Sequence, residues 1–281
     1  MKQKNSLSFT IFVIFLFCIL IIWILLPNCV YAKCDGVESR KDEFVIATWN
    51  IGHFSLGKKP YSMINHVNYH KNYVSFKSIL FDSINADVVC FNEYSKKFGI
   101  DEKEQVTITE DILKKEYANK MIGPLLGYSC NCIFSKVRIE NAQWCEYEIN
   151  KTVGRKMPRA NKYYYVDCDL YLGKKKIKLI CAHTINSASA LCQSQIAELI
   201  VKYRKIDRVI MCGDWNTKDF SLFSNSGYTL ANDGSFLTYT GSTKHKPIDN
   251  IVVKGMKISD VRVINSTLSD HNLLACKIAI E

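Results

Sequence analysis

Six short segments of the chain place a carboxylate, amide or imidazole at one end of an apolar, strand-like run. In the first four the polar group closes the run, and in the last two it opens the run. The segments are Ala47–Asn50, Cys90–Glu93, Cys181–His183, Gly213–Asn216, Pro247–Asn250 and Ser269–His271. Together they supply Asn, Glu, His and Asp side chains, a set suited to holding a hard divalent metal ion and to hydrolysing phosphate esters.

These side chains meet only if the strands that carry them have suitable directions. If the last two strands run opposite to the first four, all six polar ends lie at one edge of a layered sheet. Alternating strands and helices, followed by late antiparallel strands, predict an α/β fold with two mixed sheets packed face to face and helices outside. The expected strands are Phe44–Thr48, Val88–Phe91, Cys132–Ser135, Tyr163–Leu172, Ile177–Ala182 and Arg208–Cys212. The expected helices are Tyr73–Ile84, Glu110–Asn119 and Ala190–Tyr203.

Three of the polar residues suit a metal ion. Magnesium prefers oxygen ligands and is typically held by one or two carboxylates. We expect Glu93 and Asp270 to supply these carboxylates, and Asn50 to add a neutral oxygen or to orient Glu93. The sequence therefore predicts Mg²⁺, with Mn²⁺ as an alternative, at the sheet edge.

The remaining polar residues suit proton transfer and phosphate binding. Asp214 is placed to position or deprotonate an attacking water, and Asn216 to donate its amide to a phosphate oxygen. His271 suits contact with phosphate or proton transfer, with Asp249 fixing its tautomer. His183 is the predicted second proton donor, facing the leaving group. Taken singly, each residue is as readily a turn, a cap or a surface carboxylate, whereas six in order indicate an enzyme.

The order of these segments resembles the endonuclease/exonuclease/phosphatase superfamily, of which deoxyribonuclease I is a member. Asn50 matches the opening Asn of the family, and Glu93 matches its metal-binding Glu, although Asn92 replaces the usual Gln. Gly213–Asn216 resembles the Gly-Asp-Phe-Asn motif, and Ser269–His271 matches the closing Ser-Asp-His. Asn250 stands where the family has an aromatic residue. The resemblance spans roughly Glu43 to Ile280.

The resemblance implies a four-layer α/β sandwich with Mg²⁺ at the sheet edge. It also assigns two substrate-binding residues: Asn131, which begins a strand like the family's strand ending in Ser-Lys or Ser-Arg, and Arg159, where the family often has a phosphate-contacting basic residue. His183 stands where deoxyribonuclease I, sphingomyelinases and toxin nucleases have a His, which favours these branches over abasic-site repair enzymes.

The N-terminus reads as a separate export segment. Two lysines precede an apolar run from Phe9 to Leu26, and Val30–Ala32 fits a signal-peptidase site. We expect residues 1–32 to be a signal peptide, with a membrane anchor through residues 7–26 as the alternative, and residues 33–281 to be the catalytic domain. Either reading predicts export to the periplasm or outside the cell. Four of the 12 Cys residues lie in predicted buried strands, and Cys130 and Cys132 near Cys145 are the candidates for a bridge.

Substrate is the least determined feature. The formal net charge of +10 favours polyanions, so the leading hypothesis is an exported Mg²⁺-dependent nuclease whose substrate is nucleic acid. A sphingomyelinase-like phospholipase or another phosphoesterase is the second hypothesis, with phospholipid as substrate. A non-catalytic binding protein on the same scaffold is the third. The histidines His53, His66, His70 and His245 are not expected to be catalytic. Of these, His245, between Lys244 and Lys246, precedes Asp249 and is the one that would touch substrate phosphate if its side chain points that way. The sequence indicates no protein partner.

Overall fold

The computed structural model describes residues 42–52, 74–94, 113–125, 130–153, 162–186 and 189–280. They all belong to one compact unit of the chain, Lys41–Glu281. The predicted signal or anchor at residues 1–32 and the predicted substrate ligand Arg159 lie outside the described residues. None of the helices within the described ranges has both the length and the hydrophobicity of a membrane span.

The first sheet is built around a parallel pair of strands. Its order is β11 (Lys257–Ile264), β12 (Leu273–Ala279), β1 (Glu43–Asn50), β2 (Val88–Tyr94), β4 (Cys130–Ser135) and β3 (Asn119–Ile122). β1 runs parallel to β2 and antiparallel to β12. The carboxyl ends of β1 and β2 therefore share one edge of the sheet with the amino end of β12.

The second sheet repeats this arrangement. Its order is β5 (Arg138–Glu146), β6 (Tyr164–Leu172), β7 (Lys175–His183), β8 (Val209–Asp214), β10 (Asp249–Lys254) and β9 (Thr229–Leu230). β7 runs parallel to β8, and β10 runs antiparallel to β8. The predicted reversal of the last two strands relative to the first four is thus confirmed in both sheets.

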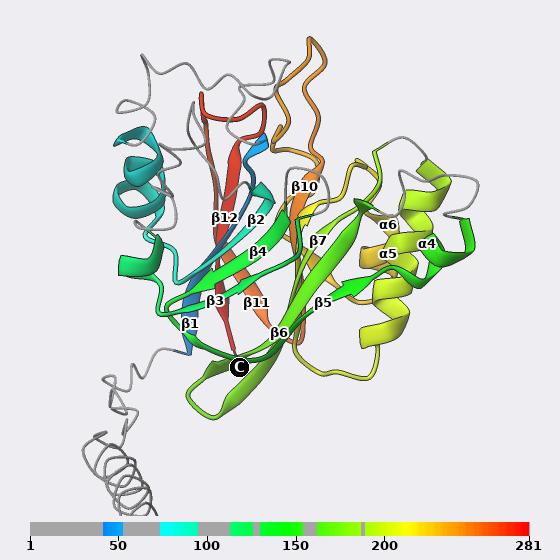
Figure 1. The fold of residues 1–281 in the computed structure, drawn as a ribbon, viewed down its shortest axis with the longest axis horizontal. Helices are drawn as coiled ribbons and strands as arrows, with labels where there is room; N and C mark the ends of the chain where they lie inside the picture. Colours follow the sequence, from blue (N-terminus) through cyan, green and yellow to red (C-terminus); the bar gives the residue numbers. More distant parts are fainter. Residues whose placement is uncertain are drawn as a thin grey trace, which may run out of the picture. The chain divides into compact units, whose positions relative to one another are not determined.

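The two sheets pack face to face, with β1 and β2 against β7, β8 and β10, and helices cover the outer faces (Figure 1). Alternation along β7 shows why both faces are apolar: Leu179 and Cys181 join the core between the sheets, whereas Ile180 and Ala182 pack toward α5 (Ser189–Tyr203). The short helices α4 (Glu148–Val153) and α6 (Ser221–Asn225) lie on the same side as α5. On the other sheet, η3 (Ser78–Ile84) buries Leu80 and Ile84.

Three elements differ from the sequence expectation. The helix expected over Glu110–Asn119 is helical at residues 113–116 but gives way to β3 at Asn119. β5 and α4 were not expected, and β5 lacks the apolar alternation of a strand because it is an edge strand with mostly exposed side chains. The hairpin predicted around Gly173 is confirmed, since β6 and β7 pair antiparallel on either side of it.

The nine cysteines within the described residues are free thiols, and eight of them are buried. The bridge expected among Cys130, Cys132 and Cys145 is therefore absent. The first two lie in the buried strand β4, whereas the Cys145 thiol lies on β5 and donates to Asp167 Oδ2 at 3.7 Å. Cysteine serves here as a small hydrophobic residue, as predicted for Cys90, Cys181, Cys212 and Cys276.

Candidate active site

The strand registers bring the six polar segments together at one edge of the sandwich. In the second sheet His183 pairs with Asp214, and Asp214 pairs with Asp249 across three neighbouring strands. In the first sheet Asn50 pairs with Asn92, which directly precedes Glu93. The Asn50 amide then crosses between the sheets and donates to Asp214 Oδ2 at 2.9 Å. Residues that lie far apart in the sequence therefore share one cluster.

A histidine between two carboxylates forms the centre of this cluster. The Nδ1 atom of His271 lies 2.8 Å from Asp249 Oδ2, and its Nε2 atom lies 3.7 Å from Asp214 Oδ2. Burial alone would lower the pKa of His271, but the charges of Asp249 and Asp214 outweigh burial and raise the pKa to about 10. His271 is therefore an imidazolium at neutral pH, oriented through Nδ1 by a fully buried carboxylate.

Asp214 is held on three sides. One oxygen accepts the Asn50 amide, and the other accepts the backbone N–H of Asn216 at 2.9 Å. Burial raises the pKa of Asp214 above its ordinary value, and the facing His271 imidazolium opposes that rise. The Asn216 side chain donates to the Thr184 carbonyl at 2.8 Å, which leaves its second amide hydrogen for another acceptor.

His183 and Glu93 lie on the outer side of Asp214. The Nε2 atom of His183 is 3.6 Å from Asp214 Oδ2 and 4.0 Å from Glu93 Oε1. The His183 ring packs edge-on against Tyr163, with 5.1 Å between the ring centres. Glu93 has φ of +50°, an unfavourable conformation for a residue with a side chain, and its carboxylate accepts from Asn50 at 3.4 Å. Its side chain is 30% exposed, so Glu93 faces solvent at the mouth of the cluster.

Asp270 sits between two glycines. A Cβ atom on Gly52 would lie 3.0 Å from Asp270 Oδ1, and a Cβ atom on Gly241 would lie 2.8 Å from Asp270 Oδ2. The Ser269 hydroxyl donates to the Asn50 carbonyl at 2.7 Å, which ties this segment to the end of β1. The half-buried Asp270 carboxylate thus has space on both sides that any larger residue would fill.

Asn92 braces the two sheets, a role that the sequence did not reveal. Its amide nitrogen donates to Ala182 O at 2.9 Å and Asn131 Oδ1 at 3.0 Å, and its oxygen accepts the Asp214 N–H at 2.8 Å. Gly213 permits this approach, because a Cβ atom there would lie 2.9 Å from Asn92 Oδ1 and 1.9 Å from the Ala182 carbonyl oxygen. The one signal in the sequence was the amide directly before Glu93.

Asn131 and Asn250 are also engaged by the protein. The Asn131 amide donates to the Tyr164 carbonyl at 2.7 Å and its oxygen accepts from Asn92, so this buried residue lies behind the cluster. Its contact with substrate stays a prediction. Asn250 exchanges two hydrogen bonds with the backbone of Asn232 at 2.7 and 2.9 Å. In this chain it therefore anchors the 232–236 turn to β10.

Within the described residues, Asp214, Asp249 and His271 bring ligand atoms within 4.8 Å of one another and form a group able to hold a metal ion. This group differs from the predicted ligands Asn50, Glu93 and Asp270. Asp249 Oδ1 is buried without a hydrogen-bond partner, whereas Oδ2 of the same residue is engaged by His271.

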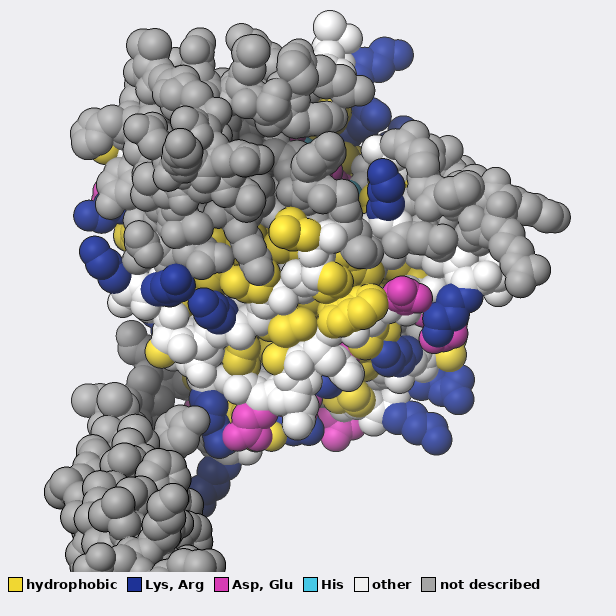
Figure 2. Space-filling view, viewed as in Figure 1, with side chains coloured by type: hydrophobic (Ala, Val, Ile, Leu, Met, Phe, Trp, Pro, Cys, Tyr) yellow, Lys and Arg dark blue, Asp and Glu magenta, His cyan; other side chains and the backbone are white. Residues whose placement is uncertain are grey.

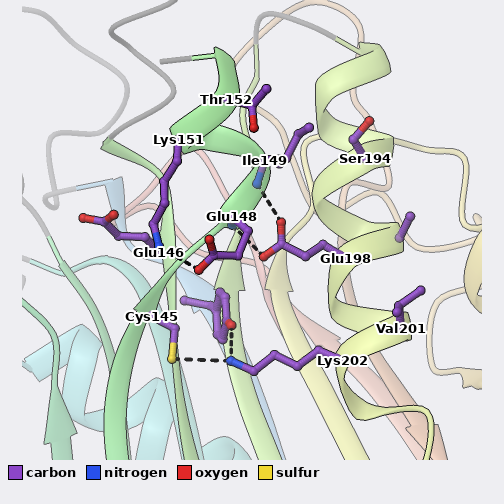
Figure 3. Close-up of a pocket in the computed structure, with 12 residues that line it drawn as sticks. Cys145, Glu146, Glu148, Ile149, Lys151, Thr152, Ser194, Glu198, Val201 and Lys202 are labelled. Carbon is purple, nitrogen blue, oxygen red and sulfur yellow. Dashed lines mark hydrogen bonds and ion pairs between the residues drawn. The ribbon is translucent and has the colours of Figure 1, made fainter. Parts of the chain in front are cut away.

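A cavity of about 1020 Å³ lies away from this cluster, between α4 and α5 (Figure 3). Its polar groups satisfy one another: Lys202 Nζ donates to the Tyr165 hydroxyl at 2.5 Å, and Glu198 accepts the backbone N–H groups of Glu148 and Ile149. None of the predicted site residues lines it. The sheet-edge cluster, rather than this cavity, carries the groups suited to chemistry.

No protein-family model matches the sequence, and no curated protein matches it significantly. Solved structures do match. D. rerio TDP2 complexed with single strand DNA product superposes with a TM-score of 0.61 at 15% identity, over 84% of this chain and 98% of that chain. An endonuclease/exonuclease/phosphatase from Beutenbergia cavernae gives 0.58 at 13% identity, over 85% and 72%. ANGEL2, a 2',3'-cyclic phosphatase, in complex with adenosine-2',3'-vanadate gives 0.59 at 13% identity, over 85% and 96%.

Identities of 13–15% bear on the arrangement of the backbone and not on activity. The matches extend over most of the described unit, and the two six-stranded sheets show the mixed order expected from the sequence. The chain therefore has the fold of the endonuclease/exonuclease/phosphatase superfamily.

Proposed function

We propose that the protein is a divalent-metal-dependent phosphodiester hydrolase and that its substrate is nucleic acid. The observation that carries this proposal is the Asp249–His271–Asp214 arrangement at the sheet edge, with a hydrogen bond of 2.8 Å to Asp249 and an ion-pair distance of 3.7 Å to Asp214. It supplies a fixed imidazolium beside a carboxylate, the pair that phosphate hydrolysis needs to stabilise developing charge and to handle a proton.

Each residue then has a defined task. Asp214, fixed by Asn50 and by the Asn216 backbone, orients and deprotonates the attacking water. His271, held at Nδ1 by Asp249, offers its Nε2–H to a phosphate oxygen. The free hydrogen of the Asn216 amide reaches a second phosphate oxygen, and His183 protonates the leaving oxygen.

The residues present fit a hard divalent ion. Mg²⁺ keeps several waters and takes one or two carboxylates, which favours groups open to solvent. Glu93 is partly exposed and Asp270 is half buried between glycines, whereas Asp249 is fully buried and engaged by His271. We therefore place the ion on Glu93 and Asp270, with Asn50 beside them, where it would stabilise the charge that develops on the phosphate.

A titration with Mn²⁺ separates the two candidate ligand sets. Glu93→Gln and Asp270→Asn are expected to weaken binding of Mn²⁺ at least tenfold, because each removes a charged ligand. Glu140→Gln, on the exposed face of edge strand β5, is the matched control and should bind as the wild type does. If Asp249→Asn weakens binding and the Glu93 and Asp270 variants do not, the ion belongs to the Asp214–Asp249–His271 group instead.

Nucleic acid is favoured as substrate by two observations. The chain carries a net charge of +10, which attracts polyanions. Among its structural neighbours, D. rerio TDP2 is complexed with single strand DNA product. The proposal also keeps the export predicted from residues 1–32, which N-terminal sequencing of the protein from its native source would test.

The substrate class is tested by incubating the full chain with plasmid DNA, RNA and sphingomyelin vesicles, with Mg²⁺ or with EDTA. We expect EDTA-sensitive cleavage of nucleic acid that is lost in His271→Ala. Cleavage of sphingomyelin with nucleic acid left intact would transfer the function to lipid. Inactivity on all three substrates would reject the proposal.

A further inference from the structure

A short hairpin stands directly on the Asp270–His271 dipeptide. Tyr239 and Lys246 exchange backbone hydrogen bonds of 2.8 and 3.0 Å and so close a turn over residues 239–246, the basic hairpin. Tyr239 also bridges to His271, and the Thr240 N–H and hydroxyl donate to the Asp270 carbonyl at 2.7 and 3.1 Å. The foot of the hairpin is therefore fixed to the candidate active site by backbone contacts.

The tip of the hairpin carries positive charge only. Lys244, His245 and Lys246 are exposed, and the sequence from Tyr239 to Ile248 contains no carboxylate. The Ser242 hydroxyl donates to the Lys244 carbonyl at 2.8 Å, which shapes the tip. Within the described residues neither Lys244 nor Lys246 has a carboxylate partner. Figure 2 shows Lys and Arg side chains beside the projecting tip, at the top of the view.

One of these cations has a defined relation to the site. Lys246 Nζ lies 5.7 Å from the centre of the Tyr239 ring, and the Tyr239 ring centre lies 5.0 Å from that of His271. The ammonium group is therefore no more than about 11 Å from the His271 ring. Because a nucleic acid strand rises about 3.4 Å per nucleotide, this distance corresponds to roughly one to three nucleotides.

We propose that the basic hairpin binds the sugar–phosphate backbone of a nucleic acid strand, at phosphates adjacent to the one held by His271. This proposal rests on the proposed function and adds a reason for preferring polymers. Lysine recognises phosphate as a point charge and reads no base, so the hairpin gives affinity without sequence preference. A substrate with a single phosphate fills the position at His271 and leaves the lysines without a ligand.

The test is the salt dependence of binding, measured with a fluorescent single strand of about 12 nucleotides in EDTA, without turnover. Each phosphate contact contributes about 0.7 to the slope of log K against log salt for single strands. Lys244→Ala/Lys246→Ala is therefore expected to lower the slope by about 1.4 and to raise KM for cleavage in Mg²⁺. A two-nucleotide substrate should show a smaller rise in KM than the longer strand.

The matched control removes two exposed lysines at the opposite ends of the strands from the candidate active site. Lys174 lies in the β6–β7 turn, and Lys205 follows α5, so Lys174→Ala/Lys205→Ala makes the same change in net charge far from His271. Its slope should equal that of the wild type. An unchanged slope in the hairpin variant, or an equal loss in the control, overturns the proposal.

The two proposals fail separately. If the wild type does not cleave nucleic acid but the slope falls only in the hairpin variant, the hairpin binds nucleic acid and the proposed function is wrong. If the wild type cleaves nucleic acid and the hairpin variant has the wild-type slope and KM, the function stands and the hairpin proposal is wrong.

Discussion

Replacing Asn92 with Leu tests how the two sheets hold the candidate active site. Leu keeps the branched shape of Asn but removes its hydrogen bonds, so the Asp214 N–H, the Ala182 carbonyl and the Asn131 amide oxygen lose a buried partner. An unsatisfied buried polar group costs about 1–3 kcal/mol. Three of them predict a loss of about 3–9 kcal/mol, a large share of the roughly 5–15 kcal/mol that stabilises a typical domain.

The assay is urea unfolding of the wild type, Asn92→Leu and Asn225→Leu, with thermal unfolding alongside. Asn225 ends α6 with an exposed side chain, so its replacement is expected to change stability by no more than about 0.5 kcal/mol. For Asn92→Leu we expect a lower midpoint with an unchanged slope, and a fall in Tm of about 10 °C or more.

The outcome that contradicts this reasoning is a loss below about 1 kcal/mol in Asn92→Leu at constant slope. The Asn92 hydrogen bonds would then be replaceable by solvent, and the position of Asp214 would have to depend on Asn50 and the strand register alone.

Three further predictions concern charge and space. Burial alone would lower the pKa of His271, but its carboxylate neighbours raise that pKa to about 10. Asp249→Asn removes the nearest charge and should lower the His271 pKa in an NMR titration. An unchanged titration midpoint would contradict the pairing of His271 with Asp249. The stabilisation linked to this raised pKa is complete below about pH 6.5 and is lost as pH rises through 10. The loss in free energy of unfolding caused by Asp249→Asn should therefore shrink at high pH. Burial would raise the pKa of Asp169, but hydrogen bonds from two lysines lower that pKa to about 2. The stabilisation linked to the lowered pKa is therefore present above about pH 3.8 and is lost as pH falls through 2. In urea unfolding, the free energy of unfolding of Asp169→Asn should approach that of the wild type only in acid. Gly241→Ala should displace the Asp270 carboxylate and weaken Mn²⁺ binding about 10–100-fold with little change in Tm, and calorimetry showing wild-type affinity would reject this crowding.

The directions of the strands and the edge at which their polar ends meet were predictable from the sequence. Apolar runs mark the strands, and the position of a polar group before or after its run indicates which end of the strand carries it. This is why Glu93, His183 and Asp214 in one direction, and Asp249 and His271 in the other, were expected to meet.

Contacts that depend on tertiary neighbours were not predictable. Asn92 bonds to groups about 90 and 122 positions away, and no local pattern indicates that its short amide reaches a backbone in the facing sheet. The basic hairpin is a comparable case, because its sequence is that of an ordinary turn until Tyr239 is seen to bridge to His271. Edge strand β5 was not predicted, because its mostly exposed side chains do not show the alternation of apolar and polar residues that is typical of a strand.

The measurement that tests the central claim most directly is the turnover of a defined DNA strand by Asp214→Asn, beside Asp219→Asn and the wild type, with Mg²⁺ or EDTA. Asp219 is exposed and accepts hydrogen bonds from the nearby Ser221, which the side-chain oxygen of Asn can also accept, so Asp219→Asn is a matched control five residues away. We expect kcat to fall about 10²–10⁴-fold in Asp214→Asn, to stay at the wild-type value in Asp219→Asn, and to vanish in EDTA for all three proteins. Wild-type turnover by Asp214→Asn would contradict the assignment of the sheet-edge cluster as the active site.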